Sequence, residues 1–138
     1  MMKTSIAITL VTILASIAPA FSQPIPPLNP GFAEPLSRVG TSGGTSNSGD
    51  CGFIAPQPNY VVTVKQPIAY LSLQLETNGG TPTLLVEGPS GRFCLLPHEA
   101  DGKIKLSGHG DPGIYNIYVG DRSGGNHSYT LNITQHRK

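Results

Sequence analysis

DPGIYNIYVGDRSGGNHSYTLNIT, residues 111–134 of the 138-residue chain, decides the fold because it contains two runs of alternating apolar and polar residues. The apolar members of these runs are Tyr115, Ile117, Val119, Tyr129, Leu131 and Ile133. A period of two is typical of β-strands that are buried on one side. Between the runs, residues 121–126 contain a Gly-Gly pair and an asparagine, which favour a chain reversal. We therefore expect a β-hairpin with one apolar face.

The segment before this hairpin contains further strand-like runs that are separated by proline and glycine. These runs are residues 60–65, 69–76, 83–87, 92–96 and 103–107. The turn Gly88-Pro89-Ser90-Gly91 predicts a second hairpin, and the two lysines of the last run predict a charged strand at a sheet edge. About seven short strands predict an all-β fold, namely a two-sheet antiparallel β-sandwich of the jelly-roll kind. A small β-barrel is the alternative, because alternation does not distinguish a closed sheet from stacked sheets.

Residues 1–22 have the features of a secretory signal peptide, with Lys3, an apolar run and small residues near Ala20. The apolar run of about 13 residues is shorter than the roughly 20 that a transmembrane helix needs, so we favour a cleaved signal over a membrane anchor. Cleavage is expected after Ala20 or Ser22. Residues 23–50 are rich in proline and then in Gly and Ser, which predicts a linker, with a docking peptide as the alternative for its proline-rich part. The β-sandwich domain is then expected to cover residues 51–138.

Cys51 and Cys94 are the two cysteines of the chain, and in an exported protein an even pair predicts one disulfide. Such a bond restricts the unfolded chain and contributes about 4 kcal/mol of stabilisation. A reactive or metal-binding pair is the alternative, but it would require CxxC spacing or nearby histidines. The signal peptide and the disulfide together predict a secreted protein, extracellular or periplasmic, that is not inserted in a membrane after signal cleavage.

The charged residues are few and evenly mixed. The sequence has nine Lys and Arg and eight Asp and Glu, and the loss of Lys3 with the signal peptide leaves eight of each sign. They form no basic cluster, which argues against nucleic acid and membrane surfaces as partners. The four histidines lack the spacing of metal ligands, and no serine lies in a nucleophile elbow. We therefore predict that the protein is not an enzyme and needs no cofactor.

Two motifs resemble the bacterial pre-peptidase C-terminal (PPC) domain family, whose members are small jelly-roll-like sandwiches at the ends of secreted proteases and other exported proteins. The motifs are TPTLLVEGPSG at residues 81–91 and PGIYNIYVGDRSGGNHSYTLNIT at residues 112–134. In the second motif the family positions are occupied by Pro112, Gly113, Tyr115, Ile117, Val119, Gly124, Gly125, Tyr129, Thr130 and Leu131. The resemblance implies a non-catalytic β-sandwich.

The chain departs from the family pattern in two ways. Residues 82–86 read PTLLV where relatives carry an Asp-x-Asp pair, and the catalytic module that such domains normally follow is missing from this sequence. We therefore expect a free-standing copy. An accessory role beside a separately encoded secreted enzyme becomes one alternative for its function.

Calcium is the one metal that we consider, with Asp111, Asp121 and Asn126 as ligands. The three residues lie in loops that we expect at one end of the sandwich, and calcium prefers oxygen ligands. The alternative is that these residues only shape turns, because Asp and Asn side chains often bond their own backbone.

Tyr70, Ile114 and Tyr118 point away from the predicted core, and if their strands are neighbours they form an exposed patch. We predict a secreted non-catalytic module that binds a polysaccharide or a secreted or cell-surface protein with this patch. One alternative is that the three side chains only cover loops or the linker. Another is that the protein is a structural unit that associates with copies of itself in an extracellular assembly.

Overall fold

The computed structural model describes Thr12 and residues 23–137. All regular elements in these residues are β-strands, and none of the described chain forms a helix long and apolar enough to cross a membrane. The predicted signal peptide, residues 1–22, lies outside the described residues apart from Thr12. Its cleavage after Ala20 or Ser22 therefore stays a prediction.

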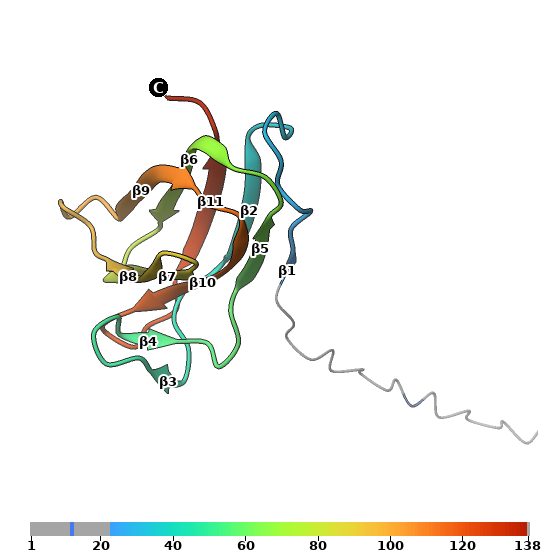
Figure 1. Cartoon of the computed structure of the whole chain (residues 1–138). Helices are drawn as coiled ribbons and strands as arrows, with labels where there is room; N and C mark the ends of the chain where they lie inside the picture. Colours follow the sequence, from blue (N-terminus) through green and yellow to red (C-terminus); the bar gives the residue numbers. More distant parts are fainter. Residues whose placement is uncertain (1–11, 13–22, 138) are drawn as a thin grey trace, which may run out of the picture.

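The described residues form eleven strands in two sheets that pack against each other (Figure 1). The first sheet contains β1 (Gln23–Pro24), β3 (Ser46–Asn47), β4 (Phe53–Ile54), β5 (Tyr60–Val64), β7 (Pro82–Gly88), β8 (Gly91–Leu95) and β10 (Gly113–Asp121). The second sheet has the order β2-β11-β6-β9, with β2 (Leu36–Thr41), β6 (Ile68–Thr77), β9 (Lys103–Gly110) and β11 (Ser128–Thr134). All neighbours are antiparallel except β1 and β5. The predicted two-sheet β-sandwich is confirmed, and the alternative of a closed barrel is wrong.

The stretch of residues 111–134 does not form the predicted hairpin. β10 lies in the first sheet between β5 and β7, whereas β11 lies in the second sheet between β2 and β6. Residues 122–127 carry the chain from one sheet to the other (Figure 1). The predicted faces are nevertheless right, because Ile117, Val119 and Leu131 are buried in the core. Two strands with one apolar side each can lie side by side or face to face across a core, and these two lie face to face.

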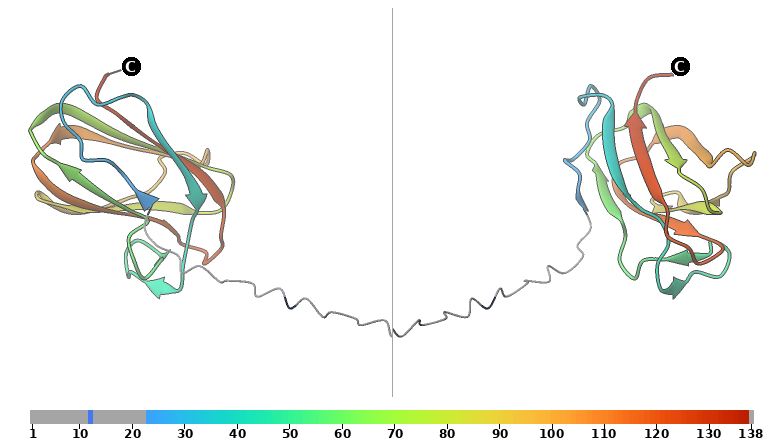
Figure 2. Two further views of the ribbon diagram at one scale, coloured as in Figure 1. Left: turned by 90° about the vertical axis from the view of Figure 1, so that its right-hand side faces the viewer. Right: turned by 180° about the vertical axis from the view of Figure 1, so that it is seen from behind.

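The segment of residues 23–50 is part of the domain, so the prediction of a linker is wrong. β2 pairs along its whole length with β11, and the two strands lie side by side in Figure 2. Ile25 and Leu28 are 8 % and 2 % exposed and belong to the core. Proline is tolerated in extended edge segments, and isolated apolar residues can fill the gaps between strands. The count of about seven strands was too low because β1, β2 and β3 lie inside the supposed linker and the two-residue strand β4 follows it.

Two tyrosines join the sheets at the centre of the core. Tyr60 of β5 and Tyr129 of β11 share a hydrogen bond of 2.7 Å between their Oη atoms, and their rings meet edge to face. Burial raises the pKa of both phenols. The Tyr129 ring lies on Gly40 of β2, where a Cβ atom would come within 2.6 Å of the Tyr129 hydroxyl. The glycine at position 40 therefore makes room for this contact.

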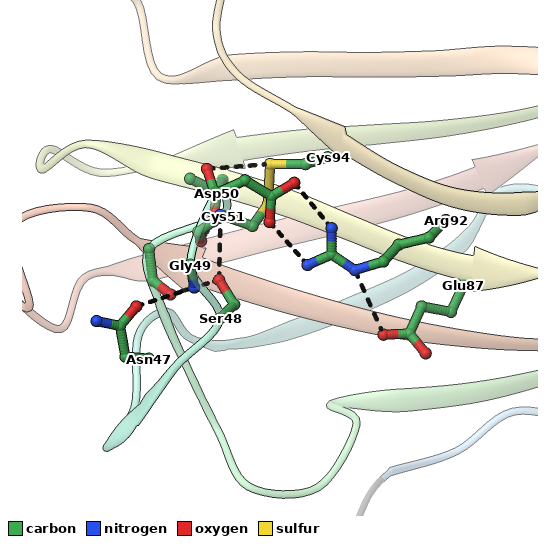
Figure 3. The surroundings of a disulfide bond; sticks show 10 residues. Asn47, Ser48, Gly49, Asp50, Cys51, Glu87, Arg92 and Cys94 are labelled. Carbon is green, nitrogen blue, oxygen red and sulfur yellow. Dashed lines mark hydrogen bonds and ion pairs between the residues drawn. A yellow bond between two sulfur atoms is a disulfide. The ribbon is translucent and has the colours of Figure 1, made fainter.

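The predicted disulfide between Cys51 and Cys94 is confirmed. It joins the segment before β4 to β8 on the outer face of the first sheet (Figure 3). Cys51 and Ile54 form a second, smaller apolar cluster there with Leu85 of β7. The disulfide thus holds the segment around Cys51 and Ile54 against part of this outer face.

An ion pair lies beside the disulfide. The Arg92 guanidinium donates two hydrogen bonds of 2.8 Å to the Asp50 carboxylate, and its Nε atom is 3.9 Å from Glu87 (Figure 3). The hydrogen bonds from Arg92 hold the pKa of Asp50 below its ordinary value. The Arg92 side chain is therefore directed over its own sheet, toward β7 and the residues before Cys51.

Two predicted features define the open side of the sandwich. β7 and β8 form the predicted second hairpin, with Gly88 opposite Gly91. β9 is the predicted edge strand, with Lys103 and Lys105 exposed and Ile104 buried. Among the described strands, β8 pairs only with β7 and β9 pairs only with β6, so each sheet ends there in a free strand edge. Both edges lie on the left in Figure 1.

Candidate functional site

The predicted patch of Tyr70, Ile114 and Tyr118 is not assembled. Tyr70 lies on β6 in the second sheet, whereas Ile114 and Tyr118 lie on β10 in the first. Tyr118 packs against the apolar cluster beside the disulfide, and the Arg137 guanidinium lies 4.8 Å from the centre of the Tyr70 ring. Ile114 is 61 % exposed, while the two tyrosines are half-buried. The alternative, in which these side chains cover neighbouring parts of the chain, fits both tyrosines.

The three residues considered for calcium do not meet at one end of the sandwich, so that expectation is wrong. Asp111 precedes β10 and Asp121 ends it, which separates them by about 30 Å at the rise of an extended strand. Asn126 follows Asp121 in the segment that crosses between the sheets, but Asp121 is buried and accepts hydrogen bonds from Thr81 and Ser123. In the described part of the chain, no group of three or more His, Cys, Asp or Glu could hold a metal ion.

A groove of about 270 Å³ opens where the free edges of β8 and β9 leave the two sheets uncovered. Strands β6 to β10 all contribute to its lining, so the groove spans both sheets. Its apolar wall consists of Leu71, Leu73, Val86, Phe93, Leu106 and Tyr115. We call this site the edge groove.

Phe93 is the exposed aromatic residue of the edge groove. It lies opposite Val86, on the side of the first sheet that faces the core. Val86 is 2 % exposed, whereas Phe93 is 45 % exposed, because β8 is the last strand of its sheet and no neighbour covers the ring. Exposed aromatic rings in apolar grooves are typical of binding sites.

Asp111 organises the polar end of the edge groove. Its carboxylate accepts a hydrogen bond of 2.9 Å from Ser90 Oγ and contacts His109 Nδ1 at 3.0 Å. Its backbone carbonyl accepts a hydrogen bond of 2.7 Å from Tyr115 Oη. All three partners line the groove, so this residue, predicted as a calcium ligand, instead fixes side chains of the groove.

The charge states at this end follow from the same contacts. The hydrogen bonds from Ser90 and His109 hold the pKa of Asp111 below its ordinary value. Burial, and after it the charge of Asp111, raises the pKa of the Tyr115 phenol. At neutral pH the carboxylate is therefore ionised and the phenol is protonated. The groove offers an apolar wall beside hydroxyl and imidazole groups.

Sequence reasoning placed Tyr115 on an apolar face and the other apolar residues of the edge groove in predicted strands, but it missed the groove itself. Alternation places Phe93 and Leu106 on inner faces, but it does not reveal that β8 ends its sheet. The available signal was the predicted edge strand at residues 103–107, since an edge implies that one side of the sandwich is open there. The sequence of β8 did not indicate that it is also an edge strand, because it contains no lysine.

The chain is similar in sequence to a protein of Synechococcus elongatus and in fold to a solved bacterial domain. No family model matches the chain. An uncharacterized protein of Synechococcus elongatus is 42 % identical over 103 residues, which cover 72 % of this chain and 75 % of that protein. The pre-peptidase C-terminal domain of a collagenase from Bacillus anthracis has a TM-score of 0.57 at 18 % identity, with 86 % of this chain and all of that domain covered.

A second solved structure is much less similar. PliG, a periplasmic inhibitor of g-type lysozyme from Aeromonas hydrophila, covers 78 % of this chain at 17 % identity. Its TM-score of 0.40 is too low to bear on function. The PPC resemblance of the sequence motifs is confirmed for the fold, and no enzymatic family is indicated. The chain belongs to the same protein family as the uncharacterized protein of Synechococcus elongatus and has a PPC-like fold.

Proposed function

We propose that this protein is a secreted, non-catalytic binding module that takes an apolar side chain of a secreted or cell-surface protein into the edge groove. The observation that carries the proposal is Phe93, an aromatic ring on a core-facing side that stays 45 % exposed. The apolar wall around Phe93 would release water when a side chain of the ligand takes the place of that water, and this release favours binding. A separately encoded secreted enzyme is one protein of this partner class.

A protein ligand suits the edge groove better than a polysaccharide does. Six of the lining side chains are apolar or aromatic, and the polar groups of Ser90, His109 and Tyr115 are gathered at Asp111. A sugar carries hydroxyl groups around its ring, and burying them against leucine and valine without partners would be unfavourable. In a polypeptide, an apolar side chain could contact the apolar wall while the neighbouring peptide bond contacts the polar groups near Asp111.

A binding role also agrees with the chemistry of the polar end. The Ser90 hydroxyl and the His109 imidazole both face Asp111 instead of each other. A nucleophilic serine needs a hydrogen bond to its base, so this arrangement supports positioning of the groove and not covalent catalysis. Secretion is supported by the disulfide, which is typical of proteins that fold in oxidising compartments.

The proposal is tested with peptides selected from a random library displayed on phage. We expect the wild-type protein to enrich peptides with a recurring apolar residue, and we expect Phe93→Ala to weaken their binding at least tenfold in calorimetric titration. Ile114→Ala is the matched control, because Ile114 is an exposed apolar side chain on β10 outside the groove. Unchanged binding by Phe93→Ala, or an equal loss with Ile114→Ala, would show that the edge groove is not the site.

A further inference from the structure

We propose that the partner binds as an additional β-strand along the free edge of β8, so that its main chain pairs with Arg92 and Cys94. This inference rests on the proposed function, because it names how a polypeptide would lie at the edge groove. It commits to one class of ligand, an extended polypeptide segment with apolar side chains at every second position.

The turn of the β7–β8 hairpin determines which main-chain groups of β8 are free. Gly88 and Gly91 flank the two-residue loop Pro89-Ser90, and residues in that position exchange hydrogen bonds with each other. Hydrogen-bonded and open pairs alternate along an antiparallel ladder, so Phe93, opposite Val86, also bonds to β7. The N–H and C=O groups of Arg92 and Cys94 therefore point away from β7.

No other described segment occupies these outward groups. β8 pairs only with β7, and none of the backbone hydrogen bonds between described loops reaches Arg92 or Cys94. The disulfide of Cys94 lies against Leu85 of β7, and the Arg92 guanidinium reaches Asp50 and Glu87 of β7 (Figure 3), so both are on the outer face of the sheet. An extended polypeptide matches such a row of alternating donors and acceptors, whereas a polysaccharide has no N–H groups in this spacing unless it is amidated.

The other open edge beside the groove is guarded. β9 carries Lys103, whose Nζ atom lies 4.0 Å from Glu76, and Lys105, and a second strand placed there would have to accommodate both long side chains. β8 has Arg92 as its one charged residue, and that side chain is held by Asp50 and Glu87. The charge pattern therefore leaves β8 as the edge that accepts a strand.

Strand addition at β8 also explains how the groove would be filled. Side chains of an added strand that lie level with Phe93 and Leu95 would point to the core side, against Leu106 and Tyr115 of the edge groove. Those level with Arg92 and Cys94 would point to the outer face. The main chain would then provide affinity, and every second side chain would provide specificity.

The test compares two substitutions at one position. Arg92→Pro removes the outward N–H, and proline is tolerated at an edge where that N–H is not used within the sheet. Arg92→Ala keeps the N–H but equally removes the ion pair with Asp50, so it is the matched control. With the phage-selected peptides as ligand, we expect Arg92→Pro to bind at least tenfold more weakly than Arg92→Ala. Equal binding by the two variants would overturn strand addition.

Hydrogen exchange provides a readout that does not depend on the folding of a variant. In the wild-type protein, we expect the Arg92 and Cys94 amides to become protected when the selected peptide binds, while the amides of β9 keep their exchange rates. Protection on β9 alone would contradict the inference. If Phe93→Ala loses peptide binding and Arg92→Pro does not, the groove remains the site and strand addition is excluded. If neither substitution changes peptide binding, both proposals are excluded.

Discussion

At the scale of single residues, Asp121 is the buried carboxylate that joins the turn before β7 to the segment crossing between the sheets. It is fully buried at the end of β10 and accepts hydrogen bonds from the backbone and hydroxyl groups of Thr81 and Ser123, while His127 Nδ1 lies 3.2 Å from its second oxygen. Gly80 has a positive φ of 77°, and a Cβ atom there would collide with His127 and Asp121. The segment that crosses between the sheets is therefore anchored to the turn before β7.

The protonation of Asp121 predicts how stability depends on pH. Burial by itself raises the pKa of Asp121, but the hydrogen bonds from Ser123 and Thr81 outweigh burial and hold the pKa below its ordinary value. A carboxylate whose pKa is lower in the folded state stabilises the fold above the pKa of the unfolded chain, near 4, and loses that contribution as the pH falls through the folded pKa.

We predict that Asp121→Asn lowers the free energy of unfolding by about 2 to 3 kcal/mol near neutral pH, because the amide presents an N–H₂ group to donors that need an acceptor. Urea titrations at several pH values measure this effect. The difference between variant and wild type should shrink as the pH falls below about 4. Glu87→Gln, at a half-buried surface position 3.9 Å from Arg92, is the control and should change stability little. A difference that does not vary with pH would contradict the role of the ionised carboxylate.

At the scale of elements, β2 decides where the domain begins. It covers the free edge of β11, and Ile25 and Leu28 before it fill part of the core. Its sequence, LSRVGT, contains only two residues that favour strands, Val39 and Thr41, and its burial alternates only between half-buried and exposed. Such a strand depends on its neighbour for stability and has little pattern of its own.

We predict that a chain starting at Cys51 does not fold, whereas a chain starting at Gln23 does. Without residues 23–50, β11 would lose one of its two neighbouring strands, and the core would lose Ile25 and Leu28. Both chains keep the disulfide, so the comparison isolates the N-terminal strands. Thermal unfolding followed by circular dichroism should be cooperative for the longer chain alone. A cooperative transition in the shorter chain would support a linker after all.

At the scale of the whole molecule, the disulfide is the feature that connects the fold to its compartment. The bond ties the segment around Cys51 and Ile54 to β8, and pairs of this kind persist where the surroundings are oxidising. The same strand carries Phe93 and the free edge, so the covalent bond also anchors the proposed binding edge. Export, folding and binding are thus expected to depend on one another.

We predict that the protein expressed with its full N-terminus is exported and processed. Intact mass spectrometry of the exported form should give an N-terminus at Phe21 or Gln23, corresponding to cleavage after Ala20 or Ser22. Labelling with a thiol reagent should require prior reduction, since both cysteines are in the disulfide. Retention of residues 1–22 on a protein found in the membrane fraction would instead favour the alternative of a membrane anchor.

The sequence by itself determined the positions of most strands, their inner faces, the β7–β8 hairpin and the disulfide. These features follow from local rules: side chains alternate along a strand, Gly and Pro reverse the chain, and two cysteines in an exported protein pair. The PPC-like fold was also within reach, because the motifs at residues 81–91 and 112–134 retain the family's turn and strand pattern.

Only the tertiary structure decided which strands are neighbours. Tyr115 to Val119 and Tyr129 to Ile133 have the same alternation whether they pair in one sheet or face each other across the core, because alternation specifies a buried side and not a partner. For the same reason, the sequence did not predict that β2 pairs with β11 or that β8 lies at an open edge. The edge groove exists because of those long-range pairings, which bring Leu71 of β6, Phe93 of β8 and Leu106 of β9 together from three separate parts of the chain.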